Sequence, residues 1–302
     1  MTSVIICTHN PRADYLGRIL EALKTQTLSK DQWEMLLIDN ASDEAIVDRV
    51  DLSCHPNARY IREAALGLTH ARVRGINESR GNLLIFVDDD NVLDNDYLER
   101  AVQIAADCTQ IGAFGGSVKA EFEVSPPDWV TPFISGFAVD ELDRDYWANI
   151  ASWSRATPFG AGMCVRRSVA KAYAASTETQ PLRKLLDRSG TTVASGGDSD
   201  LAWTAVDLGM GTGRFKSLRL THLIPKRRLT EDYIVKLQAS FVYCRIILDS
   251  LRGASPPKRK KKSKARLHYW RTYLNKNVTY GRILRESIKA EESAVRLINS
   301  IR

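Results

Sequence analysis

The sequence predicts an α/β fold with a mainly parallel sheet flanked by helices, followed by a helical, basic extension. In the first hundred residues, short apolar runs alternate with segments whose apolar side chains recur at helical spacing. The run from Leu83 to Val87 is continuously apolar, as expected for a strand buried on both faces. Strands and helices in alternation form a parallel sheet whose ligands bind at the carboxyl ends of the strands.

The predicted elements follow in order along residues 1–225. The strand SVIIC precedes a helix, and then come the strands EMLLIDN and ARYIRE, a helix from Leu68 to Glu78 and the strand LLIFV. From Val118 to Trp153 the chain is rich in proline, tryptophan and acid, which indicates an irregular excursion of the kind that recognises a variable partner. Regular structure resumes with PFGAGMCVRRSV, a helix beginning in GGDSDLAW, and a last strand ending at His222.

The net charge of +7 hides a division between two parts of the chain. Residues 226–302 carry 20 lysines and arginines against 6 aspartates and glutamates, a balance of +14, whereas residues 1–225 have a balance of −7. Helical patterns in YIVKLQASFVYCRIILDSL and from Leu267 to Ile301 flank the basic run PPKRKKKSKAR. We therefore expect one domain over 1–225 and a helical, basic extension over 226–302.

The bulk composition is that of an ordinary globular protein, with 44% hydrophobic and 26% charged residues. The first residues contain no basic leader and no small-residue cleavage site, and no stretch approaches the roughly 18 consecutive apolar residues that a membrane span requires. The five cysteines are scattered and show no metal-ligand spacing, which indicates free thiols in a reducing compartment. A cytoplasmic protein is therefore expected.

Three adjacent carboxylates, Asp88, Asp89 and Asp90, follow the strand that ends at Val87. Like charges this close raise one another's pKa unless a cation neutralises them. Because hard divalent cations prefer oxygen ligands, the trio predicts a Mg²⁺ or Mn²⁺ site. Other polar residues that follow strands are expected at the same edge of the sheet: Thr8, His9 and Asn10 after the first strand, and Asp39 and Asn40 after the second.

These segments, in this order, resemble the family-2 inverting glycosyltransferases with a GT-A fold, over roughly Thr2 to His222. The resemblance is carried by VIICTHNPRADYL, LLIDNASDE, GLTHARVRGI, FVDDDNVLDNDYLE, FGAGMCVRRSV and GGDSDLAW. It implies a metal-dependent enzyme that moves a sugar from a nucleotide-diphosphate donor, a UDP or dTDP sugar, to an acceptor hydroxyl. The acceptor implied is a polysaccharide, a lipid-linked glycan or another glycoconjugate.

The resemblance also implies roles for individual residues. The nucleotide would be held by Thr8, His9, Asn10 and Asp39, with Asp39 addressing the base, and the diphosphate would face Arg72. Asp88 and Asp90 occupy the outer positions of the family's DXD motif, and Asp89 would touch ribose or metal. His222 falls where many GT-A enzymes place a histidine that reaches the metal or the diphosphate, although a histidine satisfied by its own strand end remains an alternative.

The acceptor hydroxyl is a poor nucleophile at neutral pH and needs a positioned base. Asp198 matches the family's base position. The family commonly has Glu-Asp at this place, whereas this chain has Gly197-Asp198, so one carboxylate is missing. Asp200 therefore stays a second candidate for the base.

Two other functions stay open from the sequence. A sugar nucleotidyltransferase uses a similar fold but normally has a glycine-rich phosphate loop after the first strand, where this chain reads CTHNPR. A non-catalytic nucleotide-sugar-binding homologue would be consistent with the carboxylate missing at Gly197. The basic run predicts attraction to an anionic membrane surface, with a solvated tail or a protein partner as alternatives. Nucleic acid is disfavoured because no aromatic residue lies inside the run.

Overall fold

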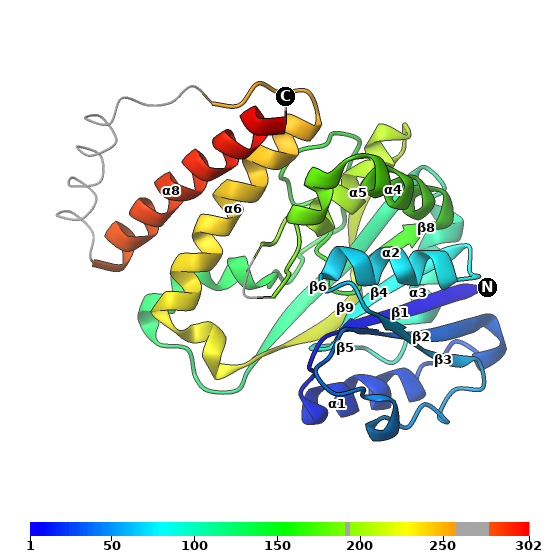
Figure 1. The fold of residues 1–302 in the computed structure, drawn as a ribbon. Coiled ribbons are helices and arrows are strands. Elements are labelled where there is room, and N and C mark those ends of the chain that lie inside the picture. Colours follow the sequence, from blue (N-terminus) through cyan, green and yellow to red (C-terminus); the bar gives the residue numbers. More distant parts are fainter. Residues whose placement is uncertain (191–193, 258–277, 302) are drawn as a thin grey trace.

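The computed structural model describes residues 1–190, 194–257 and 278–301 (Figure 1). Most of the basic run, residues 258–266, lies outside the described residues, so the predictions of membrane attraction or another partner for it stay predictions. The same holds for the beginning of the helix expected from Leu267, whose described part begins at Val278. Within the described ranges, no helix has both the length and the apolar character needed to cross a bilayer.

The chain forms a single mixed sheet with helices around it (Figure 1). The strands are β1 (Thr2–Thr8), β2 (Trp33–Asn40), β3 (Ala58–Glu63), β4 (Leu83–Asp88), β5 (Asn91–Leu93), β6 (Ile111–Phe122), β7 (Tyr146–Ala148), β8 (Cys164–Arg166) and β9 (Gly211–Ile224). The α-helices are α1 (Ala13–Lys24), α2 (Leu68–Glu78), α3 (Tyr97–Asp107), α4 (Arg167–Thr179), α5 (Gly197–Asp207), α6 (Glu231–Leu251) and α8 (Val278–Ile301). Short 3-10 helices include η3 (Asp128–Phe137), η4 (Pro181–Leu185) and η5 (Lys226–Leu229), besides Lys30–Gln32 and Val47–Arg49.

The strand order is β3-β2-β1-β4-β8-β6-β9-β5, with β7 paired to β9. Strands β1 to β4 are parallel to one another, as the alternation of strands and helices predicted, and β6 is parallel to β9. Strands β5, β7 and β8 join antiparallel. The α/β fold class is therefore confirmed.

Each face of the sheet is covered because alternate side chains of a strand point to opposite sides. Val4 and Ile6 of β1 pack with residues of α1 and α3, whereas Ile5 and Cys7 pack with residues of α2, α4 and α5. Both sets are buried. Polar residues at the ends of β1, β2 and β4 are consequently held at one edge of a sheet that is closed on both faces.

The segment from Val118 to Trp153 contains more regular structure than predicted. Strand β6 continues to Phe122, and β7 (Tyr146–Ala148) pairs with β9, so the expectation of an irregular excursion was wrong at both places. The last strand also runs two residues beyond the predicted end, to Ile224, which places His222 within a strand opposite Asn91. Backbone pairing with the long neighbour β6 supports this continuation.

Within its described residues, the extension contributes the helices α6 and α8, which run side by side (Figure 1). The N-terminus of α6 is capped by the Thr230 hydroxyl, which accepts a hydrogen bond from the backbone N–H of Tyr233. Buried residues of both helices pack with Trp203 of α5, and the first turns of α6 pack on η3. The extension thus shares cores with the rest of the chain, while a boundary at 225/226 stays a prediction.

Candidate active site

A cavity of about 640 Å³ opens where the carboxyl ends of β1 and β4 meet the loops that surround them. The register of the sheet explains this grouping, because Cys7 pairs with Asp88 and Thr8 pairs with Asp39 across β1. Of the site residues expected from the sequence, all but Asp39 and Asp200 line the cavity: Thr8, His9, Asn10, Arg72, Asp88, Asp89, Asp90, Asp198 and His222.

The turn after β1 is fixed against the end of β2. His9 Nδ1 lies 2.9 Å from the carbonyl oxygen of Asn40. Asn10 adopts the left-handed conformation with φ of 50°, its backbone N–H donates to Ser42 Oγ over 2.9 Å, and its side-chain oxygen accepts from the N–H of Asp43 over 2.9 Å. These contacts place His9 and Asn10 at the rim of the cavity, where both side chains are exposed.

Asp39 lies behind the cavity wall and is completely buried. Its carboxylate accepts hydrogen bonds from the Ser42 N–H at 3.0 Å, the Tyr60 hydroxyl at 2.6 Å and the Arg62 guanidinium at 3.0 Å. Burial raises the pKa of this carboxyl, but these hydrogen bonds outweigh burial and hold the pKa below its usual range. Its neighbour Asn40 lines the cavity instead. Contact of Asp39 with a nucleotide base stays a prediction.

The three carboxylates after β4 have different surroundings. Asp90 accepts from Arg228 Nη2 over 2.6 Å and from Asn91 Nδ2 over 3.0 Å, and His222 Nε2 lies 3.4 Å from its other oxygen. Arg228 and His222 hold the pKa of Asp90 well below its usual range, although burial opposes them. Asp89 accepts a short hydrogen bond from Thr8, but burial and the charge of Asp90 raise the pKa of Asp89 to about 7.

Asp88 has neither a hydrogen bond nor an ion pair on its carboxylate within the described part of the chain. Burial and the neighbouring Asp90 raise its pKa. In the same wall, His222 Nδ1 is buried and has no hydrogen-bond partner among the residues that the structure describes. A buried carboxylate without a hydrogen-bond or ion-pair partner is a group that a cation would satisfy.

The residues present fit a divalent cation that is shared with a bound ligand. The described residues contain no group of three or more His, Cys, Asp or Glu side chains that would chelate a metal without help. Mg²⁺ in particular is usually bound through one or two carboxylates together with substrate phosphates. Asp88 is free to act as such a ligand, whereas Asp90 and His222 are both engaged by Arg228.

Arg72 lines the cavity from α2 and is held from behind by Asp187, a residue that the sequence analysis did not single out. Arg72 Nη1 lies 3.1 Å from both carboxylate oxygens of Asp187, and Thr69 Oγ1 donates to Asp187 over 2.8 Å. Both members of the ion pair are about 95% buried. Asp187 follows no strand and belongs to no motif, so no local pattern marks it.

Asp198 lies in the first turn of α5 and faces the cavity. Its carboxylate accepts from the N–H of Ser199 at 2.7 Å and from the N–H of Gly160 at 3.1 Å. Burial raises the pKa of Asp198, Arg72 lowers it and Asp187 raises it, with a net increase. An elevated pKa makes a carboxylate a stronger base at neutral pH.

Asp200 points away from the cavity into the core. It is completely buried and pairs with Arg183 Nη1 at 2.5 Å and with Arg252 Nη1 at 3.2 Å. Two guanidinium groups therefore occupy the carboxylate, and the cavity wall does not include it. The structure brings Asp198, and not Asp200, to the other predicted site residues.

A second cavity of about 570 Å³ adjoins the first, and Asp198 lines both. One wall is a single face of α6, where Gln238, Phe241, Val242 and Arg245 follow one another at helical spacing. The rest includes the apolar and aromatic residues Phe133, Trp153, Pro158 and Phe159. Neither Gln238 nor Arg245 has a side-chain hydrogen bond or ion pair among the described residues.

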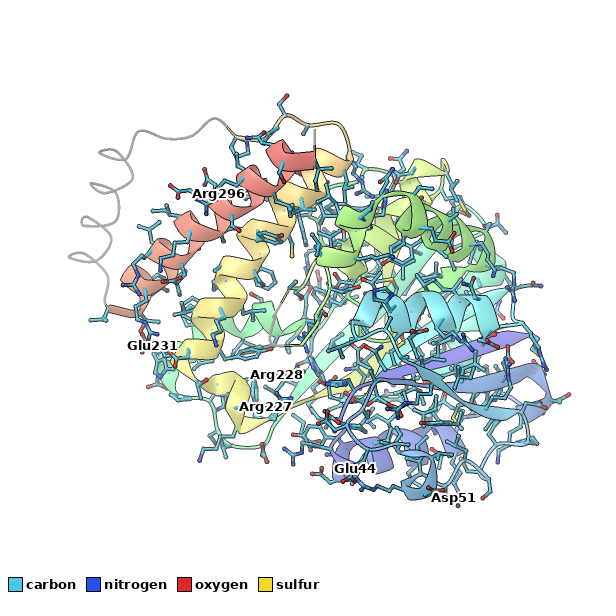
Figure 2. All side chains as sticks on the ribbon, viewed as in Figure 1. Glu44, Asp51, Arg227, Arg228, Glu231 and Arg296 are labelled. Carbon is cyan, nitrogen blue, oxygen red and sulfur yellow. The ribbon has the colours of Figure 1, made fainter. Side chains whose placement is uncertain are left out.

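Three arginines of the cavity wall were also missed by the sequence analysis. Arg227 and Arg228 belong to η5, at the entry to α6 (Figure 2), and were counted with the basic extension only. Arg188 comes from the loop after η4. In the described part of the structure, Arg188 and Arg227 line the cavity without an ion pair. The signal in the sequence was KRR placed directly after the last strand, within reach of the same sheet edge.

The chain is similar to known proteins in sequence and in fold. The model of "Glycosyl transferase family 2" matches residues 3–170. Glycosyltransferase AglE of Haloferax volcanii is 32% identical over 120 residues, which are 39% of each chain. The chain spans about a third of the length of the first curated relatives that it matches.

Two solved structures are similar in fold. The mannosyltransferase PcManGT from Pyrobaculum calidifontis, in complex with GDP-Man and Mn²⁺, gives a TM-score of 0.55 at 18% identity, covering 99% of this chain and 73% of that one. S. aureus TarS in complex with UDP gives a TM-score of 0.52 at 12% identity, covering 97% of this chain and 90% of that one. At these identities the likeness shows the fold, which is of the GT-A kind.

Proposed function

The chain belongs to glycosyl transferase family 2, and from this premise we propose that it is an inverting glycosyltransferase that moves a sugar from a nucleotide-diphosphate donor to an acceptor hydroxyl. The observation that carries this proposal is the place of Asp198, a carboxylate with a raised pKa in the wall shared by two cavities. A base between a donor and an acceptor is what a direct displacement at the anomeric carbon requires.

The first cavity is the proposed donor site. Its volume of about 640 Å³ is suited to a nucleotide sugar, and its lining combines exposed guanidinium groups with a cluster of carboxylates. We assign the nucleoside to the side of Thr8, His9 and Asn40, and the diphosphate to the side of Arg72 and Arg227. Guanidinium groups offer forked donors to phosphate oxygens.

We propose a UDP or dTDP sugar as the donor. In this proposal Asp39 acts on the nucleobase from behind the cavity wall, because it accepts a hydrogen bond from the Ser42 N–H and so fixes the turn next to Asn40. Two structures of similar fold were solved with UDP and with GDP-Man, which supports a nucleotide sugar as the donor. The binding experiment below identifies the nucleobase.

We further propose that Mn²⁺ or Mg²⁺ binds with the donor, at Asp88 with Asp90 and His222 beside it. A hard cation on the diphosphate neutralises the charge that the leaving group gains. The protein residues then have separate roles. Asp88 would hold the cation, and Arg228 keeps Asp90 ionised and in place. Arg72 and Arg227 bind phosphate oxygens of the donor. The Mn²⁺ bound to PcManGT supports this choice of metal.

The second cavity is the proposed acceptor site. Its aromatic side chains offer flat apolar surfaces to the faces of a sugar ring, and Gln238 and Arg245 offer hydrogen-bond donors to hydroxyl or anionic groups. Residues of η3 and Trp153 line it, which supports the expectation that the segment from Val118 to Trp153 selects the acceptor. A glycan or a lipid-linked glycan would suit such a site.

In the proposed reaction, the acceptor hydroxyl attacks the anomeric carbon from the side of the second cavity. The bond from this carbon to the diphosphate oxygen breaks on the opposite side, and the hydroxyl proton passes to the Asp198 carboxylate. The configuration at the anomeric carbon is therefore inverted. The hydrogen bonds from Ser199 and Gly160 hold the carboxylate in place for this step.

The first experiment is thermal-shift binding of UDP, dTDP, GDP, CDP and ADP to the full chain, each with and without MnCl₂. A ligand that binds only the native state raises the melting temperature by mass action. A shift for one nucleotide that grows with Mn²⁺ supports the proposal and names the donor class. Folded protein that shows no shift with any of the five contradicts it.

A further inference from the structure

Gly197, the first residue of α5, has no side chain because another residue fills the space. Its φ lies outside the left-handed region, so the backbone would accept any residue. A Cβ at this position would, however, overlap all the terminal atoms of the Asp187 side chain. Asp187 therefore places a carboxylate beside Asp198 from a different segment of the chain.

The backbone joins these two segments. The N–H groups of Gly196 and Gly197 donate to the carbonyl of Leu186 over 2.9 and 3.1 Å. Asp187 is thereby held at the start of α5, where its carboxylate meets Thr69 and Arg72 of α2. A buried carboxylate with three such contacts is fixed in position.

Arg72 has other carboxylates close by. The Cβ that Gly160 lacks would lie 2.9 Å from Arg72 Nη2 and 3.4 Å from Asp198 Cβ, so both side chains border the same small space. The charge of Arg72 also acts on Asp88. Without Asp187, the guanidinium would be drawn to Asp198 or Asp88, and either new pair would occupy a group that the proposed reaction needs free.

We infer that Asp187 is a positioning residue for the transfer reaction, which holds Arg72 toward the donor diphosphate and away from Asp198, and that Asp187 and Gly197 act as one unit. This inference rests on the proposed function. The unit supplies, from position 187, the carboxylate that position 197 does not carry.

The shared space is tested by a double-mutant cycle in melting temperature, which needs no substrate. Gly197→Ala is expected to lower the melting temperature by about 3 °C in the wild-type background, because Asp187 must leave its place. In the Asp187→Ala background the same change is expected to alter it by less than about 1 °C. If Gly197→Ala lowers the melting temperature equally in both backgrounds, Asp187 and Gly197 do not act as one unit.

The positioning role is tested by kinetics and by moving the carboxylate. Asp187→Ala is expected to lower kcat/KM for the donor about 100-fold and to weaken binding of UDP or dTDP, whichever the wild type binds. Asp187→Ala with Gly197→Asp returns a carboxylate to the space and is expected to recover about tenfold of this loss. Asp187→Ala with Gly197→Ala is the matched control and is expected to recover none.

Stability is separated from positioning by a second control. Glu34 is 3% exposed and pairs with Arg59 at 3.2 Å. It lies at the end of β2 that is far from Asn40 and the cavity. Glu34→Gln is expected to lower the melting temperature while keeping kcat/KM within about twofold. If Asp187→Ala does not fold, Asp187→Asn replaces it, with an expected loss of about tenfold because its shape is kept.

The outcomes separate the two proposals. The positioning role is overturned if Asp187 variants lose no more activity than Glu34→Gln while the wild type stays active. It is also overturned if Asp187→Ala with Gly197→Asp recovers no more activity than Asp187→Ala with Gly197→Ala. A wild type that binds no nucleoside diphosphate overturns the proposed function, and the role of Asp187 in the reaction falls with it.

Discussion

Arg228 donates a hydrogen bond to Asp90 over 2.6 Å, and the two side chains are 7% and 10% exposed. Asp88, two residues earlier, has no such partner in the described part of the chain. The pair thus neutralises one carboxylate of the trio and leaves another free for a cation. The first prediction rests on this division of charge.

Replacing Arg228 by methionine is expected to destabilise the protein. Removing one partner of a buried ion pair leaves an uncompensated charge, which costs about 3 kcal/mol. Mn²⁺ is expected to restore part of the melting temperature in this variant, because a cation would then neutralise Asp88 and Asp90 together. Thermal unfolding with and without MnCl₂ measures both effects, and a variant as stable as the wild type without metal would contradict the assignment.

Arg227 is expected to act on the donor and not on stability, because it is exposed and forms no ion pair with a described residue. Arg227→Ala should weaken binding of the donor nucleotide about tenfold, the effect of one charge-assisted hydrogen bond. The matched control is Arg296→Ala, since Arg296 lies on α8, away from Arg227 (Figure 2). Calorimetric titration measures both, and equal affinities for the two variants would argue against a diphosphate contact.

These residues also show which parts of the site can be predicted from the sequence. Thr8 and the Asp trio were predicted because apolar runs define β1 and β4, and the residue that follows a buried strand is placed by the strand itself. Asp187 and Arg228 meet Arg72 and Asp90 across 115 and 138 residues of chain. No periodicity or motif expresses such contacts, which depend on how η4 and η5 pack against the sheet edge.

Asp198 and Asp200 illustrate the same point within one helix. Their types and spacing left both open as the base, and only packing separates a carboxylate facing two cavities from one enclosed by Arg183 and Arg252. Strand β7 was missed for a similar reason, since its three residues are recruited by the edge of β9 and not by an apolar pattern of their own.

The two aspartates are expected to respond differently to the same change. Asp198→Asn should lower kcat by about 10²–10⁴-fold, the contribution of a general base, while nucleotide binding persists. Asp200→Asn should lower the free energy of unfolding by roughly 3 kcal/mol, because the buried Arg183 and the partly buried Arg252 lose their charged partner. Transfer assays and thermal unfolding of both variants check this, and a reversed pattern would move the base to Asp200.

The pH dependence of kcat follows from the surroundings of Asp198. Burial is the largest influence, and it raises the pKa of this carboxyl above its ordinary value. A base must be ionised, so kcat is expected to be full at neutral pH and to fall as the pH drops through this raised pKa. A pH profile at saturating donor measures the acid limb, and a limb at or below the pKa of a solvated aspartate would contradict Asp198 as the base.

Trp153 provides a test of the acceptor site that leaves the donor site intact. It lines the second cavity, is 48% exposed, and rests edge-on against Trp203 with ring centroids 5.2 Å apart. Trp153→Ala is expected to reduce transfer to a glycoside acceptor about tenfold, since an aromatic contact is worth about 0.5–1.5 kcal/mol beyond the buried area. Hydrolysis of the donor, which needs no acceptor sugar, should stay unchanged.

The matched control for this test is Trp147, which is 67% exposed and lines neither cavity. Trp147→Ala removes the same side chain from the same segment of the chain, so a general effect of tryptophan loss would appear in both variants. Transfer and hydrolysis are measured side by side with a panel of alkyl glycosides. If the Trp153 and Trp147 variants lose transfer equally, or if hydrolysis falls with transfer at Trp153, the second cavity does not bind the acceptor.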